Sequence, residues 1–234
     1  MKRVCIAVLS MLAAGTALTP GQAQIAGQAA AGPPLPAPAL QVYSNAELHL
    51  TFSYPAGLTP RDGAFAAAAA RRMLYGEDAE SERSQADACT TVLLSVGTGT
   101  EGRGAWGRLG LLEIHGQCFP AKTLQNKKAS QLLLRNLVKQ GTTTMGMMPL
   151  DQPAVYLIQG RWASFCAAQG QPVSGGDLQS ADQQLVSVVA VLVQSEVLGW
   201  VVETNDGAML NRVLGSGVDF GTGKPERLFP GLAK

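Results

Sequence analysis

The sequence predicts an α+β fold in which a mostly antiparallel β-sheet is covered by helices. Three observations predict it: segments with strand patterning outnumber helical ones, the connections between strands are short, and three helical segments are interspersed among the strands. The chain has 234 residues, a length suited to one domain with appendages. Charged residues make up only 15%, which excludes a disordered or coiled-coil body.

The first 23 residues have the pattern of a secretory signal peptide. Lys2 and Arg3 supply the positive start, an apolar stretch covers residues 4–18, and Ala23 precedes the expected cleavage site. The apolar stretch is too short to span a membrane as an uncleaved anchor, so cleavage is expected. After cleavage, no stable membrane insertion is expected. A lipoprotein would need a cysteine at the cleavage point, and Cys5 lies too early. We expect export to a bacterial periplasm or the extracellular space.

Residues 24–41 are rich in Ala, Gly, Gln and Pro, and are expected to form an extended linker that cannot bury a core. The single folded domain is expected to cover residues 42–234, which is large enough for one core. Removal of Lys2 and Arg3 from the 18 basic residues leaves 16 against 17 acidic ones, a mature net charge of −1. With that charge and an export signal, no nucleic-acid binding is expected.

Alternation and capping predict the first strand and helix of the domain. Apolar and polar side chains alternate from Leu48 to Tyr54, as in a half-buried strand. Asp62 can cap a helix that ends at Gly76. Residues 77–87 are acidic and polar, and are expected to form a solvated loop or a frayed helix end.

Two strands and a second helix are predicted for the middle of the chain. Residues 91–96 have the pattern of a buried strand, and residues 106–115 that of another. Leucine side chains recur at helical spacing over residues 122–140, and Gly141 is expected to end that helix.

Three more strands and a closing helix are predicted for the last third. The strands cover residues 154–165, 185–193 and 197–204, and the second is apolar on both faces, which favours a central place in the sheet. Asn205 or Asp206 can cap a helix that Gly215 ends.

The start of the domain also carries a short motif. An N-x-E lead-in, in the segment YSNAEL of residues 43–48, precedes a strand that ends in Tyr-Pro and a turn, in the segment FSYPAG of residues 52–57. The motif and the order of elements over residues 42–220 resemble the PsbP-like and DcrB-like exported domains. The resemblance implies an α/β/α sandwich with a non-catalytic binding or assembly role, and it carries over no active-site residues. Leu58 stands where these domains often have Trp, and the segment 76–88 is longer.

Cysteine usage fits an exported protein. Cys5 leaves with the signal peptide, and Cys89, Cys118 and Cys166 remain. An oxidising compartment favours one disulfide and one free thiol. We favour Cys89–Cys118, because both residues lie at strand edges in neighbouring elements, and Cys118–Cys166 is the alternative. The apolar run around Cys166 predicts a buried, inert thiol.

Motifs of catalytic and cofactor sites are incomplete. Residues 97–102 match G-x-G-x-x-G, but no helix follows to hold a pyrophosphate, so a hairpin loop is predicted. Neither His49, expected at the surface, nor His115 belongs to a hydrolase motif. His115 and Cys118 could supply two metal ligands, fewer than zinc sites need. No catalytic, cofactor or metal residues are therefore assigned, and no enzymatic activity is expected.

Met145, Met147 and Met148 form a cluster of soft thioethers that could bind Cu(I) outside the cytoplasm. Methionine more often fills gaps in a core. A small-ligand or copper-binding protein of the periplasm is therefore the alternative function.

Charge is segregated along the chain. Every charged residue between Glu113 and Asp151 is basic and lies in the predicted helix, over residues 122–139, whereas residues 77–87 hold five acids. Solvated surfaces explain both runs most simply, and a docking surface for a complementary partner is the alternative. Our main hypothesis is an exported, non-enzymatic domain, of unknown specific role and oligomeric state. It would bind a protein partner through one of these segments, or assist envelope assembly.

Overall fold

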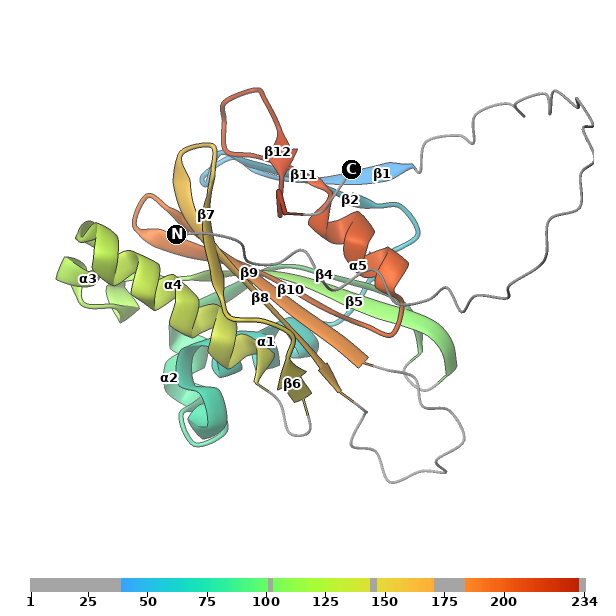
Figure 1. Ribbon diagram of the computed structural model, residues 1–234, viewed down its shortest axis with the longest axis horizontal. Helices are drawn as coiled ribbons and strands as arrows, with labels where there is room; N and C mark the ends of the chain where they lie inside the picture. The colour runs from blue at the N-terminus through green and yellow to red at the C-terminus, as the bar shows by residue number, and fades with distance from the viewer. Residues whose placement is uncertain (1–38, 101–102, 144–146, 171–183, 232–234) are drawn as a thin grey trace, which may run out of the picture.

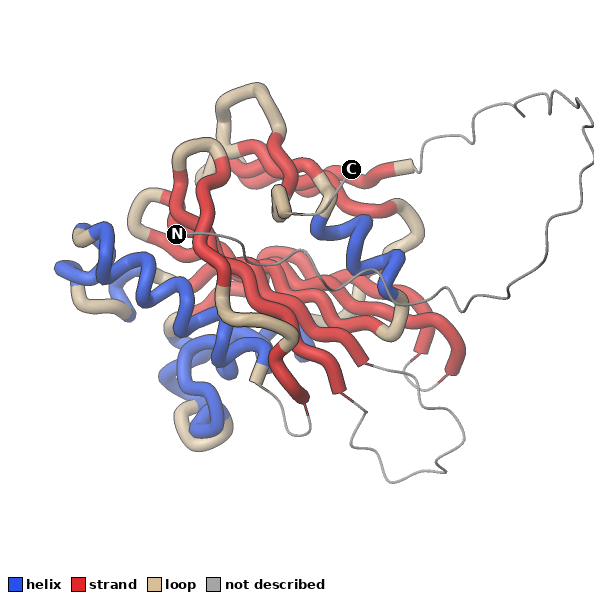
Figure 2. Tube along the Cα trace, viewed as in Figure 1, coloured by secondary structure: helices blue, strands red, loops and turns tan. Residues whose placement is uncertain are grey.

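Two antiparallel β-sheets and the helices packed on them make up the fold, as Figures 1 and 2 show for a computed structural model. The structure describes residues 39–100, 103–143, 147–170 and 184–231. The predicted signal peptide and most of the predicted linker lie outside the described residues. The α+β class predicted from the sequence is confirmed.

The larger sheet has eight strands within the described residues, and its neighbouring strands are antiparallel. Its order is β3 (Thr59–Pro60), β4 (Thr90–Thr100), β5 (Arg103–Ile114), β10 (Glu196–Thr204), β9 (Gln184–Val193), β8 (Arg161–Gly170) and β6 (Met147–Pro149), and β7 (Ala154–Ile158) also pairs with β8. The smaller sheet has the order β1 (Leu40–Asn45), β2 (Leu50–Pro55), β11 (Gly217–Asp219) and β12 (Glu226–Arg227).

Most of the helices cover one face of the larger sheet, and the smaller sheet covers the other together with the last helix (Figure 2). The helices are α1 (Ala64–Tyr75), α2 (Arg83–Ala88), α3 (Ala121–Gln125), α4 (Lys127–Thr142) and α5 (Gly207–Leu214), with 3-10 turns η1 (Gly76–Ala79) and η2 (Gly116–Cys118). Helices α1 and α4 pack against each other and the sheet, and α5 packs on β2, β9 and β10. None of the helices in the described ranges has both the length and the apolar character needed to cross a membrane.

Two hydrophobic cores lie on the two faces of the larger sheet. Between the sheets, Trp200 is 1% exposed, and its ring meets those of Phe52 and Phe220 at centroid distances of 5.8 and 6.4 Å. On the helical side, Met73 of α1 and Leu134 of α4 are fully buried. Strand β9 contributes side chains to both cores and lies between β8 and β10, which confirms its predicted central place.

Both predicted ends of the last helix and the predicted end of the first at Gly76 are confirmed, but the N-cap of the first helix is Gly63 and not the predicted Asp62, which lies one residue earlier. Asp62 accepts a 3.3 Å hydrogen bond from the first N–H of α1, and Gly76 follows that helix with a φ of 58°, which glycine tolerates without strain. Asp206 accepts a 2.8 Å hydrogen bond from an N–H in the first turn of α5, and Gly215 follows its last residue.

The single strand predicted over residues 154–165 is wrong, because a hairpin interrupts it. Gln159 and Gly160 both have positive φ, 48° and 76°, and turn the chain from β7 into β8. Two such residues form the tight turn that matches the twist of paired strands. The Gly at the second position was the available signal for this turn.

The single helix predicted over residues 122–140 is also wrong, since Asn126 divides it into α3 and α4. Asn126 has an extended backbone, with φ −94° and ψ 119°, and its side chain accepts hydrogen bonds from two N–H groups of the first turn of α4. It is therefore the N-cap of α4. Gly141 does not end this helix but lies within it, where a Cβ would come 2.6 Å from Cγ of Met73.

The segment 77–87, predicted as a solvated loop or a frayed helix end, is largely helical. Turn η1 and helix α2 occupy most of it, and Ala79 and Ala86 are buried on its inner side. These two small apolar side chains attach the segment to the domain while its acids face solvent. In addition, β1 begins at Leu40, inside the range predicted as linker, and the short strands β1, β3, β6, β11 and β12 had no predicted counterpart.

Candidate functional site

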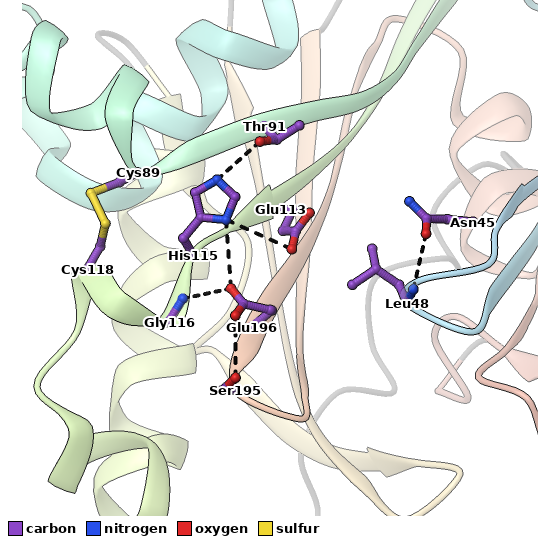
Figure 3. Close-up of polar contacts among 10 residues, drawn as sticks. All are labelled: Asn45, Leu48, Cys89, Thr91, Glu113, His115, Gly116, Cys118, Ser195 and Glu196. Carbon is purple, nitrogen blue, oxygen red and sulfur yellow. Dashed lines mark hydrogen bonds and ion pairs between the residues drawn. A yellow bond between two sulfur atoms is a disulfide. The ribbon is translucent and has the colours of Figure 1, made fainter.

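Three titratable side chains meet where β5 ends and β10 begins (Figure 3). Glu113 and His115 lie two positions apart on the chain and therefore project from the same face of the sheet. Glu196 joins them from β10, because the antiparallel register pairs its neighbour Val197 with Ile114. We call Glu113, His115 and Glu196 the carboxylate–histidine cluster.

The imidazole of His115 is the centre of this cluster. Its Nδ1 lies 3.9 Å from Glu113 Oε1 and 3.8 Å from Glu196 Oε2. Its Nε2 lies 3.1 Å from Thr91 Oγ1 on the neighbouring strand β4. The side chains of Glu113, His115 and Glu196 are 17%, 29% and 27% exposed, so the cluster is sheltered but open to solvent.

Backbone contacts hold the cluster in place. The N–H of His115 donates a 2.9 Å hydrogen bond to the carbonyl of Cys89, and the N–H of Gly116 donates a 2.7 Å bond to Glu196 Oε2. A Cβ on Gly116 would lie 1.9 Å from the carbonyl oxygen of Ser195, so only glycine lets the two turns approach this closely. The geometry of the carboxylate–histidine cluster is therefore preorganised by main chain.

The disulfide predicted between Cys89 and Cys118 is confirmed and lies beside the cluster (Figure 3). Its S–S distance is 2.08 Å and its Cα atoms are 5.9 Å apart. It joins the residue before β4 to the end of η2, and so ties together the two ends of the β4–β5 hairpin. Cys166 is free and buried, as predicted, and burial raises the pKa of its thiol.

The cluster concentrates negative charge. Burial raises the pKa of Glu113, and the carboxylates of Glu196 and Glu47 raise it further, against an opposing effect of His115. An ionised Glu113 is therefore costly in this position unless a positive charge lies close to it.

Of the candidate site residues considered from the sequence, only His115 lies in the carboxylate–histidine cluster. Cys118 cannot share a metal with His115, because its sulfur is bonded to Cys89. His49 is exposed as expected, but it lies in the turn before β2 with a φ of 50°, not on a strand. Glu113 and Glu196 were not identified from the sequence. The alternation Glu113-x-His115 was a readable signal, whereas nothing local pointed to Glu196.

Within the described residues, the glycine-rich and methionine-rich segments form no group of converging catalytic or metal-binding side chains. Gly97 and Gly99 lie in β4, which pairs antiparallel with the next strand, β5, so the predicted absence of a following helix holds, but residues 97–100 belong to the strand and not to the predicted loop. Residues 101–102 lie outside the described residues. Met147 and Met148 lie in the short strand β6, where Met148 is 67% exposed. Met145 lies outside the described residues.

The charge segregation seen in the sequence becomes a surface feature. The cations are exposed, and no acidic residue occurs from Ala121 to Thr142. We call them the basic ridge; its members are Lys122, Lys127, Lys128, Arg135 and Lys139. Leu132 of α4 is 58% exposed among them, and Lys127 Nζ lies 4.7 Å from the centroid of the Trp162 ring.

The acidic segment 77–87 is partly neutralised by Arg71 of α1 and by its own Arg83. Asp87 makes two hydrogen bonds with Arg71, of 2.8 and 3.1 Å, and these bonds lower the pKa of Asp87. Glu80 pairs with Arg83. This segment therefore presents less free negative charge than its five acids imply.

A cavity of about 480 Å³ opens beside the start of α1, between α1 and the β4–β5 hairpin. Phe65 and Trp106 line it, and Arg108 lies between them, 4.8 and 5.4 Å from the two ring centroids. Arg108 also forms a 2.9 Å ion pair with Glu203, so part of its charge is used within the domain. The volume falls in the range of small-molecule sites.

No protein-family model matches the chain, and no curated protein matches it. Among solved structures, a protein of unknown function from Pseudomonas aeruginosa, PA94, is similar with a TM-score of 0.32 and 12% identity, over 74% of this chain and 86% of that one. LpqN, involved in cell envelope biogenesis of Mycobacterium tuberculosis, is similar with a TM-score of 0.28 and 12% identity, over 53% and 75%. These distant similarities carry no argument about function, and membership in the PsbP-like or DcrB-like domains stays a prediction.

Proposed function

We propose that the chain is an exported, non-enzymatic domain that binds an acidic protein partner through the basic ridge. The observation that carries the proposal is the exposed row of cations on α3 and α4 with no carboxylate among them. Within the described part of the chain, none of these cations forms an ion pair. Their field is therefore available to an incoming surface of opposite charge, which speeds association.

An apolar contact in the same place supports this choice of surface. Leu132 projects from the middle of the ridge, and a docked partner would remove it from water. The acidic segment is the weaker candidate, because Arg71 and Arg83 already pair with two of its acids. The Cys89–Cys118 disulfide fits an oxidising compartment, as does the PsbP-like or DcrB-like resemblance. We favour a role for this chain as an envelope assembly factor that binds its partner through the basic ridge.

A charge reversal tests the proposal. The bait proteins are the wild type, Arg135→Glu on the ridge, and Lys224→Glu as a matched control in the exposed loop between β11 and β12. Each is cross-linked in an envelope fraction, and the captured protein is then purified for association kinetics.

We expect Arg135→Glu to lose the partner that the wild type and Lys224→Glu retain. The wild-type association rate should fall steeply with added salt, because exposed charges are screened over about 10 Å at 0.1 M. Equal capture by the two variants, or a rate that salt does not change, would overturn the proposal.

A second candidate function is small-ligand or copper binding. The cavity beside Phe65 and Trp106 favours the first, and thermal-shift screening against ligand libraries tests it. For copper, a Cu(I) titration is repeated after Met147→Ala and Met148→Ala. Unchanged binding in these variants removes the methionine cluster from consideration.

A further inference from the structure

We propose that the carboxylate–histidine cluster is a binding site for a divalent transition-metal ion such as Zn²⁺. One imidazole nitrogen and two carboxylates converge there from two neighbouring strands (Figure 3). This donor set suits Zn²⁺ and its first-row neighbours, whereas Ca²⁺ and Mg²⁺ prefer oxygen ligands alone. The site is separate from the basic ridge and does not depend on the function proposed for it.

The spacing of the three donors fits a shared ion. His115 Nδ1 is 3.9 and 3.8 Å from its two carboxylate neighbours, and one donor atom of each residue lies within 4.8 Å of the others. A point equidistant from three atoms so separated is roughly 2.0 to 2.5 Å from each, close to the Zn–N and Zn–O distances of about 2.0 to 2.2 Å. Small side-chain rotations complete the fit.

The same spacing argues against a direct ion pair as the purpose of the cluster. A protonated His115 would draw a carboxylate to the 2.7–2.9 Å that is usual for charge-assisted hydrogen bonds. Both contacts of Nδ1 are about 1 Å longer than that, and they are nearly equal. The imidazole nitrogen is therefore aimed between the two carboxylates and not at either one.

Outer contacts orient the ligands as they do in metal sites. With its hydrogen on Nε2, His115 donates to Thr91 Oγ1, which leaves the lone pair of Nδ1 directed at the carboxylates. The N–H of Gly116 donates to Glu196 Oε2, the oxygen that faces Nδ1, and so fixes its position. Metal-ligating histidines and carboxylates usually have such second hydrogen bonds.

The electrostatics favour a cation at this place. Glu113 and Glu196 are partly buried beside each other, and Glu47 adds a third negative charge nearby. A divalent ion relieves this repulsion. Three protein ligands leave at least one coordination position open, and the exposure of the side chains lets water or another donor reach it.

The binding test uses the full chain without a histidine tag, with its disulfide intact and after removal of metal with EDTA. Calorimetric titration with Zn²⁺ measures affinity and stoichiometry, and visible absorption with Co²⁺ reports the ligand field. The variants are Glu113→Gln, His115→Gln and Glu196→Gln. His49→Gln is the matched control, because His49 is the other histidine and is exposed.

We expect one Zn²⁺ per chain, an affinity at least about tenfold weaker in each cluster variant, and an unchanged affinity in His49→Gln. Zn²⁺ should also raise the melting temperature of the wild type but not of Glu113→Gln. If His115→Gln fails to fold, the test rests on Glu113→Gln, because glutamine has nearly the same shape as glutamate. Equal Zn²⁺ binding by the wild type and Glu113→Gln, or an equal loss in His49→Gln, overturns the proposal.

Discussion

Removal of the Cys89–Cys118 disulfide should destabilise the domain strongly. The bond closes a loop with a sequence separation of 29 residues that contains the whole β4–β5 hairpin. The loop-closure entropy lost by the unfolded chain for that length corresponds to about 3.5 kcal/mol at 25 °C. For a domain of this size, such a loss lowers the melting temperature by roughly 7–14 °C.

The assay is urea denaturation followed by tryptophan fluorescence, in which the buried Trp200 reports on the core. The double variant Cys89→Ala/Cys118→Ala is compared with the wild type, with and without a reducing agent. The reducing agent should lower the wild type to the stability of the double variant and leave the double variant unchanged. Cys166→Ala serves as the control, because it removes the free thiol and keeps the disulfide.

A second readout connects the disulfide to the carboxylate–histidine cluster. The carbonyl of Cys89 accepts the backbone hydrogen bond of His115, so loss of the cross-link frees the segment that positions the imidazole. Reduced protein that is still folded should therefore bind Zn²⁺ more weakly. A double variant within about 1 kcal/mol of the wild type would refute the loop-closure reasoning. An unchanged Zn²⁺ affinity would refute the link to the cluster.

Four further substitutions test particular contacts. Glu113→Gln should stabilise the metal-free protein at pH 7 in urea titrations, because the pKa of Glu113 is raised in the folded state and its ionised form is unfavourable there. This gain in stability should vanish as the pH falls through the raised pKa of Glu113 towards about 4. Asp87→Asn should reduce stability near pH 6, since the folded-state pKa of Asp87 is lowered by its arginine partner; the difference should disappear as the pH falls below about 4, and a constant difference would contradict the ion pair. Gly116→Ala should lose about 1–3 kcal/mol and weaken Zn²⁺ binding, because its Cβ would meet a backbone oxygen at 1.9 Å. Trp200→Ala should lose about 3–5 kcal/mol in urea titrations followed by far-UV circular dichroism, because the variant lacks the fluorescent reporter, and a loss below about 1 kcal/mol would contradict its central place in the core.

The sequence predicts correctly those strands and helices that are determined by their own apolar runs and capping residues. The strands β9 and β10 follow from runs that are mostly apolar, and α5 follows from a capping Asp206 and a closing Gly215. The errors have local causes too. Asn126 lies among leucines at helical spacing, although asparagine is a preferred N-cap, and Gly160 is the one local sign of the β7–β8 turn within the predicted strand.

Tertiary pairing decides the parts that periodicity could not predict. The segment 77–87 has the composition of a loop, and only the burial of Ala79 and Ala86 shows why it is helical. In the smaller sheet, β11 and β12 have three and two residues, and β11 pairs with β2 whereas β12 pairs with β11. A sequence pattern holds no record of such pairing when the strand itself has only two or three residues.

The carboxylate–histidine cluster shows the same limit in the candidate site. Near His115 in the chain, the sequence offers only Cys118 as a second ligand, which is too few for a zinc site. Gly116 and Glu196, which are hydrogen-bonded, lie 80 positions apart, and the antiparallel register of β5 and β10 brings them together. The disulfide was predictable from the same geometry, since the two ends of a hairpin lie close to each other. Cys89 and Cys118 therefore lie beside His115. The ends of neighbouring strands are the places where ligands that are far apart in the sequence, such as His115 and Glu196, can meet.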